Sequence, residues 1–337
     1  MSLPRRVPGW ALALLGLGAF ALFPQVDGNV TATSIAVFAL IYMVATSAWN
    51  IFSGYSGYLA LGHAVFFGTG AYALALAEQG WQVPAGWTVF ALLPFAGLVA
   101  GLVAIPVGMI ALRTRRHTFV VVTIAIFFVF QLFATNVAFT GGTAGYQLNQ
   151  PVWSAYTFND PFIYMAVLVL AGTVALSWAV RRSRFGLQLL SIRDDEERAR
   201  GLGVRVGRVK LAAFVLSAIP VGMVGGLYAF FLGSIYPQSV FDPLFDISIA
   251  LMGFLGGLGT IAGPLLGGLV LESLQQYFTQ HSGDYLIIYG VLFLVVILVL
   301  PRGVIPSLQQ LWRWYRTRSE RTTVSQDPSS DVAGALR

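Results

Sequence analysis

The chain of 337 residues contains no cysteine, a single lysine and only three histidines. Without cysteine it can form no disulfide and no thiolate metal site. A GxxxxGK[ST] phosphate loop needs a lysine that follows a glycine, and Val209 precedes the only lysine, so the chain cannot bind ATP in the P-loop manner. The histidines form neither an HExxH motif nor a cluster with acids. We therefore expect no metal, no cofactor and no catalysis by this chain, and any ATP-driven activity needs a second polypeptide.

Charged residues are also scarce, at 10% of the chain against about 25% in an ordinary soluble domain. Hydrophobic residues make up 57%, and the mean hydropathy is +0.75. A soluble fold could not cover so much apolar surface. The composition therefore predicts an integral membrane protein. Its spans are expected to be helical, because the apolar runs lack the two-residue alternation of membrane strands.

Apolar runs separated by short polar breaks predict the spans, each of roughly 20 residues. They lie near Pro8–Phe23, Thr31–Phe52, Tyr58–Ala77, Trp87–Leu112, Thr118–Phe139, Phe162–Val180, Leu211–Leu232 and Tyr285–Leu300. The first run imitates a signal peptide, but no convincing small-x-small cleavage site precedes Pro24, and we interpret it as a retained helix.

The apolar segment Asp246–Phe278 is interrupted by Gly256, Gly257, Gly259, Gly263 and Pro264. It is too long for one span and short for two, so it predicts a helical hairpin that either crosses twice or re-enters. The predicted fold class is thus all-α, a polytopic membrane helix bundle with about 8–10 transmembrane helices. Residues 1–310 are expected to form a single transmembrane domain, and 311–337 a polar cytoplasmic tail that is disordered.

The basic residues follow the topology of the spans. All 20 Lys and Arg lie in 1–7, 113–117, 181–210 and 302–337. The breaks on the opposite side carry only acids, namely Asp27, Glu78, Asp160, Asp242, Asp246 and Asp284. Because cytoplasmic loops are enriched in Lys and Arg, this pattern predicts that both termini are cytoplasmic. It also explains the net charge of +6 without a nucleic-acid partner.

The largest basic segment, 181–210, is too long for a plain connection between two helices. Asp194 and Glu197 predict a capping box that opens one short helix. The arginines of its last turn complement the helix dipole, and glycines end it. Two interpretations stay open, a docking helix for a cytoplasmic partner and a solvated loop made basic only by the topology, and the capped helix favours docking.

The glycine-rich segment Gly54–Tyr72 either packs helices closely or lines a cavity. A lone histidine such as His63 at membrane depth is more typical of a hydrogen-bonded packing element than of a ligand. Glu272 is the only acid within a predicted span. Ionisable residues in membranes are often functional, but Glu272 also lies one turn from Gln275 and Gln276, where it could reach the outer interface.

Six segments in order resemble one family. Ser47–Asn50 with Gly54–Tyr72 resembles NLLxGYxGQxSLGHAAFFGIGAY, residues 111–125 resemble LRxRGxYFAIVTLA, 140–145 TGGxxGL, 186–213 GRALxAIRxxExAAxxLGIxVxxxKLxAF, 253–268 VLGGLGSxxGPxxGA, and 300–303 LPRG. Over roughly residues 40–305 the chain therefore resembles the LivM-type permeases of branched-chain amino acid ABC importers, in the LivH/LivM family.

This resemblance implies a transport subunit in the lipid bilayer of a bacterial inner membrane. Its expected partners are two cytoplasmic ATP-binding subunits, a second related permease and a periplasmic substrate-binding protein. The expected ATPase coupling loop contains Gly186, Ile192, Arg193, Asp194, Glu197, Ala199, Gly201, Leu202 and Gly203. Candidate residues of the translocation pathway are Gly57, Gly62, His63, Gly70, Tyr72 and Glu272.

The chain departs from the family pattern at three places. Position 58 is Tyr for Gln, position 60 is Ala for Ser, and 115–118 read Arg-Arg-His-Thr rather than a glycine followed by an aromatic. If these side chains face the pathway, the substrate differs, and relatives carry urea, short amides and other amino acids. An ion-coupled secondary transporter and an intramembrane enzyme are further alternatives, which the scarcity of intramembrane acids and bases disfavours.

Overall fold

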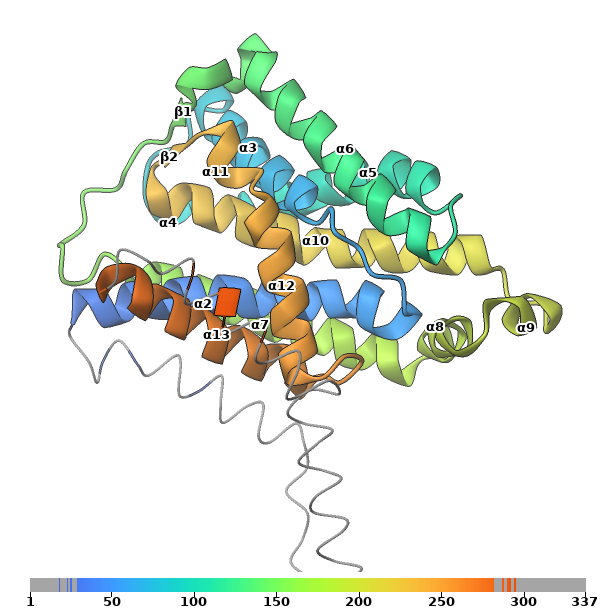
Figure 1. The fold of residues 1–337 in the computed structure, drawn as a ribbon. Coiled ribbons are helices and arrows are strands. Elements are labelled where there is room, and N and C mark those ends of the chain that lie inside the picture. The colour runs from blue at the N-terminus through green and yellow to red at the C-terminus, as the bar shows by residue number, and fades with distance from the viewer. Residues whose placement is uncertain are drawn as a thin grey trace, which may run out of the picture.

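The computed structural model describes residues 29–281 without a gap, with isolated helical positions on either side. This part of the chain is almost entirely helical (Figure 1). Its longer helices are α2 (Val30–Trp49), α3 (Ala64–Gly80), α5 (Leu93–Ala111), α6 (Arg116–Asn136), α7 (Asp160–Arg182), α10 (Val206–Leu232), α12 (Pro243–Gly256) and α13 (Ala262–His281). Among the described residues, six helical segments are long and apolar enough to cross a membrane, which confirms the predicted all-α membrane fold.

Most predicted spans coincide with these helices. The shorter elements between them are η1 (Asn50–Gly54), α4 (Trp87–Phe90), η2 (Ala138–Thr140), η3 (Gly142–Ala144), α8 (Arg184–Asp194), α9 (Glu196–Gly201) and α11 (Pro237–Val240). The predicted spans Pro8–Phe23 and Tyr285–Leu300 and the predicted tail 311–337 lie outside the continuously described residues.

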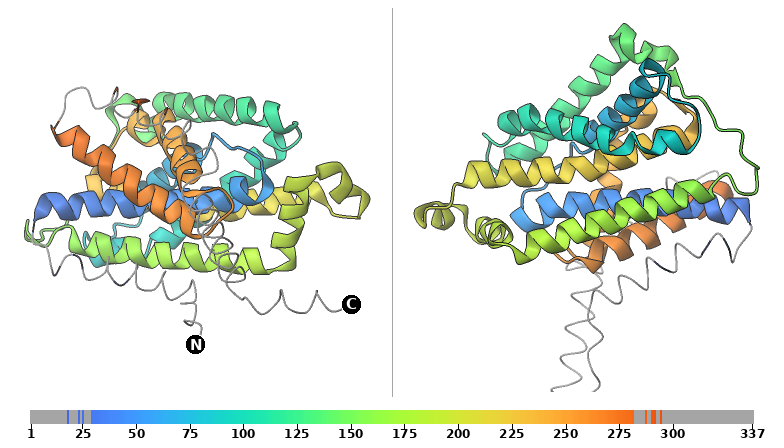
Figure 2. Two further views of the ribbon diagram at one scale, coloured as in Figure 1. Left: turned by 60° about the horizontal axis from the view of Figure 1, so that its bottom comes forward. Right: turned by 180° about the vertical axis from the view of Figure 1, so that it is seen from behind.

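The helices form two layers (Figures 1 and 2). One layer holds α3, α5, α6 and α10, and the other holds α2, α7 and α13, while α12 runs from one layer to the other. Helix α10 packs tightly on α3 because small residues face each other there: a Cβ at Gly70 would lie 2.0 Å from the carbonyl oxygen of Gly222. Small residues at helix interfaces are how membrane helices approach closely in the absence of a hydrophobic driving force.

The segment between α2 and α3 differs from the prediction. A single span was predicted to begin at Tyr58, but residues 57–63 are not helical and α3 begins at Ala64. Gly57 has a φ of 72°, which takes the chain out of the helical path. The carboxylate of Asp246, from α12, then accepts hydrogen bonds from the backbone N–H groups of His63 at 2.7 Å and Ala64 at 3.1 Å. These are unpaired donors at the first turn of α3, so the cap that fixes where this helix starts comes from a distant segment.

The predicted hairpin Asp246–Phe278 consists of α12 and α13, joined by a turn at 257–261. The turn needs glycine, since Gly257 has a φ of 112° and Gly259 a φ of 75°. Asn50, at the end of α2, holds this turn: its side chain accepts from Gly259 N at 2.8 Å and donates to Thr260 O at 2.9 Å. Two interrupted segments, 50–63 and 257–261, are thereby tied to each other.

A two-stranded antiparallel sheet lies at the end of the molecule away from α8 and α9 (Figure 1). Strand β1 (Tyr146–Gln147) pairs with β2 (Ser234–Ile235), with Tyr146 opposite Ile235. The backbone N–H of Asn149 also donates to the carboxylate of Glu78 at 3.1 Å. These contacts fix the long connection between α6 and α7 against the end of α10.

Candidate coupling and translocation site

The segment 181–210, in which one short helix was predicted, forms two helices, α8 and α9, between the end of α7 and the start of α10. They lie at one end of the molecule, beyond the ends of α7 and α10 (Figure 1). Ser183 caps α8 by accepting from Gly186 N at 3.2 Å. Ile192 and Ala199 are buried and hold the two helices against the bundle. The segment is thus an ordered structure.

The predicted cap of the second helix is wrong by one residue. The predicted cap, Asp194, is instead the last residue of α8. The cap of α9 is Asp195, whose Oδ1 accepts from the backbone N–H groups of Glu197 and Arg198 at 3.0 Å each. The helix ends at Gly201, and Gly203 has a φ of 86°, as the predicted stop signals require.

Arg193 connects α8 to both interrupted segments. Its Nη1 donates to the carbonyl oxygen of Gly54 at 2.8 Å. A Cβ at Gly57 would lie 2.9 Å from Arg193 Cγ, and a Cβ at Gly259 would lie 2.5 Å from Arg193 Nη1. The arginine therefore occupies space that exists only because positions 57 and 259 are glycines. Arg116 supports it from α6, donating to the carbonyl oxygens of Ile192 at 2.9 Å and Arg193 at 2.7 Å.

A second connection joins α9 to α10 and to the interrupted segment 50–63. The ammonium group of Lys210 lies 3.1 Å and 3.3 Å from the two carboxylate oxygens of Glu196 and 3.0 Å from the Tyr58 hydroxyl. The Tyr58 hydroxyl in turn donates to Glu196. Lys210 also lies 4.1 Å from the centre of the Tyr58 ring, a cation–π distance. We call Tyr58, Glu196 and Lys210, together with Arg116 and Arg193, the coupling joint.

Glu196 is the one acidic residue of this joint, and its neighbours keep it ionised. Partial burial alone would raise the pKa of the Glu196 carboxyl, but the hydrogen bond from Tyr58 and the charge of Lys210 outweigh it and hold the pKa below its ordinary value of 4.5. Arg200 adds a further ion pair with Glu196 at 3.2 Å. The carboxylate is thus kept ionised, which the pair with a buried ammonium requires.

The sequence interpretation missed Tyr58, Glu196 and Lys210 as site residues. Two signals pointed toward them. Lys210 is the only lysine of the chain, and Tyr58 is a departure from the family pattern. The structure places the Tyr58 side chain in the coupling joint, so this departure does not by itself alter a substrate-facing surface. Arg116, another departure, lies in the same joint.

A cavity of about 350 Å³ adjoins the joint. Its wall combines the two guanidinium groups with the interrupted segments and apolar side chains: Trp49, Ser53, Gly54, Gly57, Leu59, Arg116, Arg193, Phe254 and Leu258. Of the candidate pathway residues, Gly57 is the one that the structure places on this cavity.

The remaining pathway candidates near α3 lie in the packed core. His63 is fully buried, with Nε2 3.0 Å from the Ser217 hydroxyl and its ring edge-on to Phe214. Gly62 lies against α6, because a Cβ there would be 2.9 Å from the Thr123 carbonyl oxygen. Tyr72 stacks on a phenylalanine ring of the loop before α12. Within residues 29–281 no three His, Asp or Glu side chains gather as a metal site.

Glu272 lies on α13 and is fully buried. Gln276 donates to its Oε1 at 2.8 Å, while its Oε2 has no hydrogen-bond partner among the described atoms. The alternative in which Glu272 reaches the outer interface is therefore wrong: the side chain faces the protein. It shares no hydrogen bond with His63 in the described structure, so the two ionisable candidates do not form the acid–base pair that an intramembrane enzyme would need.

Comparisons with known proteins agree with this architecture. Residues 31–300 match the family model described as branched-chain amino acid transport system, permease component. The high-affinity branched-chain amino acid transport system permease protein LivM of Escherichia coli K12 is 28% identical over 327 residues, covering 88% of this chain and 74% of the relative.

Shorter matches extend over less than half of the chain. The probable branched-chain amino acid transport permease protein LivH of Methanocaldococcus jannaschii is 28% identical over 42% of this chain and 46% of its own length. The L-arabinose ABC transporter permease protein AraH of Azospirillum brasilense is 28% identical over 47% of this chain and 44% of its own length. No solved structure matches the chain significantly.

Proposed function

The chain belongs to the branched-chain amino acid transport permease family of ABC importers, and from that premise we propose that it forms half of a pathway for branched-chain or related amino acids. It is a multi-pass membrane subunit and not a catalytic one. The second half would be a related permease, and the energy would come from two cytoplasmic ATP-binding subunits. A periplasmic binding protein would deliver the substrate.

The position of Arg193 carries this proposal. The residue stands on the segment that the resemblance assigns to the ATPases, and its side chain reaches the interrupted segments of the membrane bundle. A displacement of α8 by a partner would therefore act directly on Gly54 and on the turn at Gly259. Interrupted helices are the usual sites where membrane transporters bind or gate substrates. The geometry supports a mechanical path from α8 and α9 to the cavity beside them.

The charge pattern supports the orientation. The segment 181–210 carries nine of the 20 basic residues, and the arginines of 113–116 lie beside it at the same end of the molecule. Cytoplasmic segments are enriched in Lys and Arg. We therefore place α8 and α9 on the cytoplasmic side, where ATPases would meet them, and the β1–β2 sheet on the periplasmic side.

The exposed surface of α6 supports a second permease. In the most apolar stretch of this helix, only 22% of the residues are buried within the chain. Val121, Phe128, Val129 and Leu132 are each more than half exposed. A helix that uses so little of its surface inside its own bundle has room to contact both lipid and a partner helix. We propose that α6 lies next to the pathway shared with the sister permease.

Two of the relatives support the proposed substrate class. A permease named for branched-chain amino acids matches 88% of this chain, whereas the arabinose permease matches 47%. Urea or a short amide is the alternative within the same family, and an ion-coupled secondary transporter is the alternative outside it.

Co-purification of the tagged chain from its native membrane, followed by uptake in proteoliposomes, tests the proposal. We expect an ATPase pair and a second permease to accompany the chain, and uptake of labelled leucine, isoleucine or valine to require both ATP and the binding protein. Uptake of labelled urea in place of these amino acids would identify the alternative substrate. Uptake by this chain alone under an imposed ion gradient would refute the ABC mechanism.

A further inference from the structure

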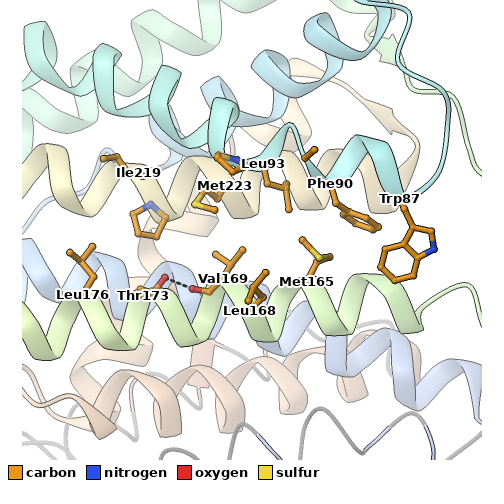
Figure 3. A pocket seen from close by; sticks show the side chains of 14 residues that line it. Trp87, Phe90, Leu93, Met165, Leu168, Val169, Thr173, Leu176, Ile219 and Met223 are labelled. Atoms are coloured by element: carbon orange, nitrogen blue, oxygen red, sulfur yellow. Dashed lines mark hydrogen bonds between the residues drawn. The ribbon is translucent and has the colours of Figure 1, made fainter.

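An apolar groove separates the two layers at a distance from the coupling joint. It has a volume of about 540 Å³ and lies between α7 on one side and α4, α5 and α10 on the other. In Figure 3 Met165, Leu168 and Leu176 project into it from α7, and Met223 projects from the facing helix α10. The groove is open at its side, since Leu168 is 63% exposed.

The lining of the groove excludes a polar occupant. Of its fourteen residues, only Thr173 and Trp87 carry a side-chain hydrogen-bond donor. The Thr173 hydroxyl already donates to the carbonyl oxygen of Val169, 2.8 Å away on the same helix, as Figure 3 shows. Trp87 lies at one end. The ammonium and carboxylate of an amino acid would find no partners inside, and burying them unpaired is strongly unfavourable. The groove is therefore not a binding site for the cargo.

The groove is too small to enclose a helix of a partner protein. From Met165 to Leu176 the groove follows α7 for eleven residues, or about 16 Å. A helix with its side chains is about 10–12 Å wide, so a helix of this length would fill more than about 1,200 Å³, whereas the groove has a volume of about 540 Å³. The length is close to half of the bilayer's hydrocarbon thickness of about 30 Å. Both measures fit a single hydrocarbon chain within one leaflet.

The groove also has an interfacial end. Trp87 is 59% exposed and lies next to Phe90 and Met165, at the end of the groove toward the beginning of α7 (Figure 3). Its ring packs against the ring of Trp153, with 6.1 Å between the two ring centroids. Tryptophan is enriched where the hydrocarbon meets the lipid headgroups. This end lies away from α8 and α9, so it is the periplasmic end if those helices are cytoplasmic.

We propose that this groove is a binding site for one acyl chain of a phospholipid, held between α7 and the pair α5–α10 with its headgroup near Trp87. Contacts with both walls retain the chain, since an empty groove would leave its walls without dispersion partners. The assignment to the periplasmic leaflet rests on the proposed orientation of the permease. The presence of the chain in the groove does not, and it depends on neither the substrate nor the ATPases.

Photolabelling of the purified transporter complex tests the proposal. The complex is reconstituted in phosphatidylethanolamine–phosphatidylglycerol vesicles with a trace of phosphatidylcholine that carries a diazirine midway along one acyl chain. After illumination the labelled residues are mapped by mass spectrometry. We expect Met165, Leu168 and Met223 to be labelled more heavily than Leu98 and Leu102, which are exposed side chains of α5 outside the groove.

Gly172→Phe fills the groove, because a Cβ at Gly172 meets nothing within 4 Å and this residue lines the cavity. The variant should lose most of the labelling at Met165 and Met223 and keep the labelling of α5. Ala175→Phe, on an exposed α7 position that does not line the groove, is the matched control and should keep both.

Three results would overturn the proposal. Labelling of the groove no heavier than that of Leu98 and Leu102 in the wild-type complex would mean that no chain is held there. Unchanged groove labelling in a folded Gly172→Phe complex would mean the same. A crosslink from the groove residues to another polypeptide would show that a protein covers it. The wild-type map decides on its own if the Gly172 variant fails to assemble.

Discussion

The ion pair between Lys210 and Glu196 offers an energetic test of the coupling joint. Lys210 is only 3% exposed, and its ammonium group lies within 3.3 Å of both carboxylate oxygens of Glu196. Lys210→Met keeps the apolar stem of the side chain and removes the charge. Glu196 would then keep the Tyr58 hydroxyl and Arg200, but it would lose its closest cation.

Removing one partner of a fully buried pair costs about 3–5 kcal/mol. The side chain of Glu196 is still 22% exposed, so water compensates part of the loss. We expect a cost of about 2–3 kcal/mol, the range of a hydrogen bond to a charged group. A domain of about 310 residues has an unfolding entropy of about 0.65 kcal/mol/K, so this cost corresponds to a fall in Tm of about 3–5 °C.

Thermal unfolding of the purified protein in detergent measures this effect. The matched control is Arg198→Met, which breaks an ion pair with Asp195 in which the arginine side chain is 86% exposed, and which should cost at most about 1 kcal/mol. Lys210→Arg should recover part of the stability. A Lys210→Met protein no less stable than the Arg198→Met protein would refute the reasoning, because the joint would then contribute no more than a surface pair.

Three further predictions follow from the same contacts. Because the pKa of Glu196 is lowered in the folded state, its contribution to stability is complete above pH 4.5 and is lost as the pH falls below that value, so the Tm of the wild-type protein should fall more steeply than that of Glu196→Gln on acidification. Gly57→Ala should reduce uptake without removing the protein from the membrane, since φ is 72° there and the new Cβ would displace Arg193; Gly207→Ala, at an open position, is the control. Asp246→Ala removes the cap of α3 and should cost about 1–2 kcal/mol, while Asp246→Asn keeps one acceptor and should cost less, as thermal unfolding of both would show.

The architecture was predictable where the information is local. Composition gives the membrane environment, and the apolar runs give most of the long helices, because each span must satisfy its own backbone hydrogen bonds in lipid. The glycine and proline cluster of the hairpin correctly predicted two helices with a turn between them, since Gly257 and Gly259 both adopt a positive φ. The stop of α9 at Gly201 is local in the same sense.

The interruption at 57–63 was not predictable from its own residues. The run from Tyr58 is apolar enough to continue as a helix, and the start of α3 is fixed by the carboxylate of Asp246, which lies more than 180 positions away. The shift of the α9 cap from Asp194 to Asp195 has a different cause. Both residues cap helices equally well, and the choice depends on how far α8 continues, which its packing through Ile192 decides.

The candidate site was predicted only in part, because its contacts also join residues that are far apart in the sequence. Arg193 was identified from the family pattern, but its contact with Gly54 joins residues 139 positions apart. Lys210 and Tyr58 are 152 positions apart. A single lysine in a chain with 20 basic residues indicates a specific requirement, and the structure supplies it as the buried partner of Glu196.

Simultaneous measurement of ATP hydrolysis and substrate uptake by the Arg193→Ala complex tests the central claim most directly. The complex is reconstituted with its ATPases, sister permease and binding protein, and compared with Arg113→Ala, an exposed residue of the connection between α5 and α6, outside α8, α9 and the joint. If Arg193 transmits the motion of α8 to the interrupted segments, its loss should leave ATP hydrolysis running while uptake per ATP falls, and the control should behave as the wild type. Wild-type uptake per ATP in the Arg193→Ala complex would contradict the account.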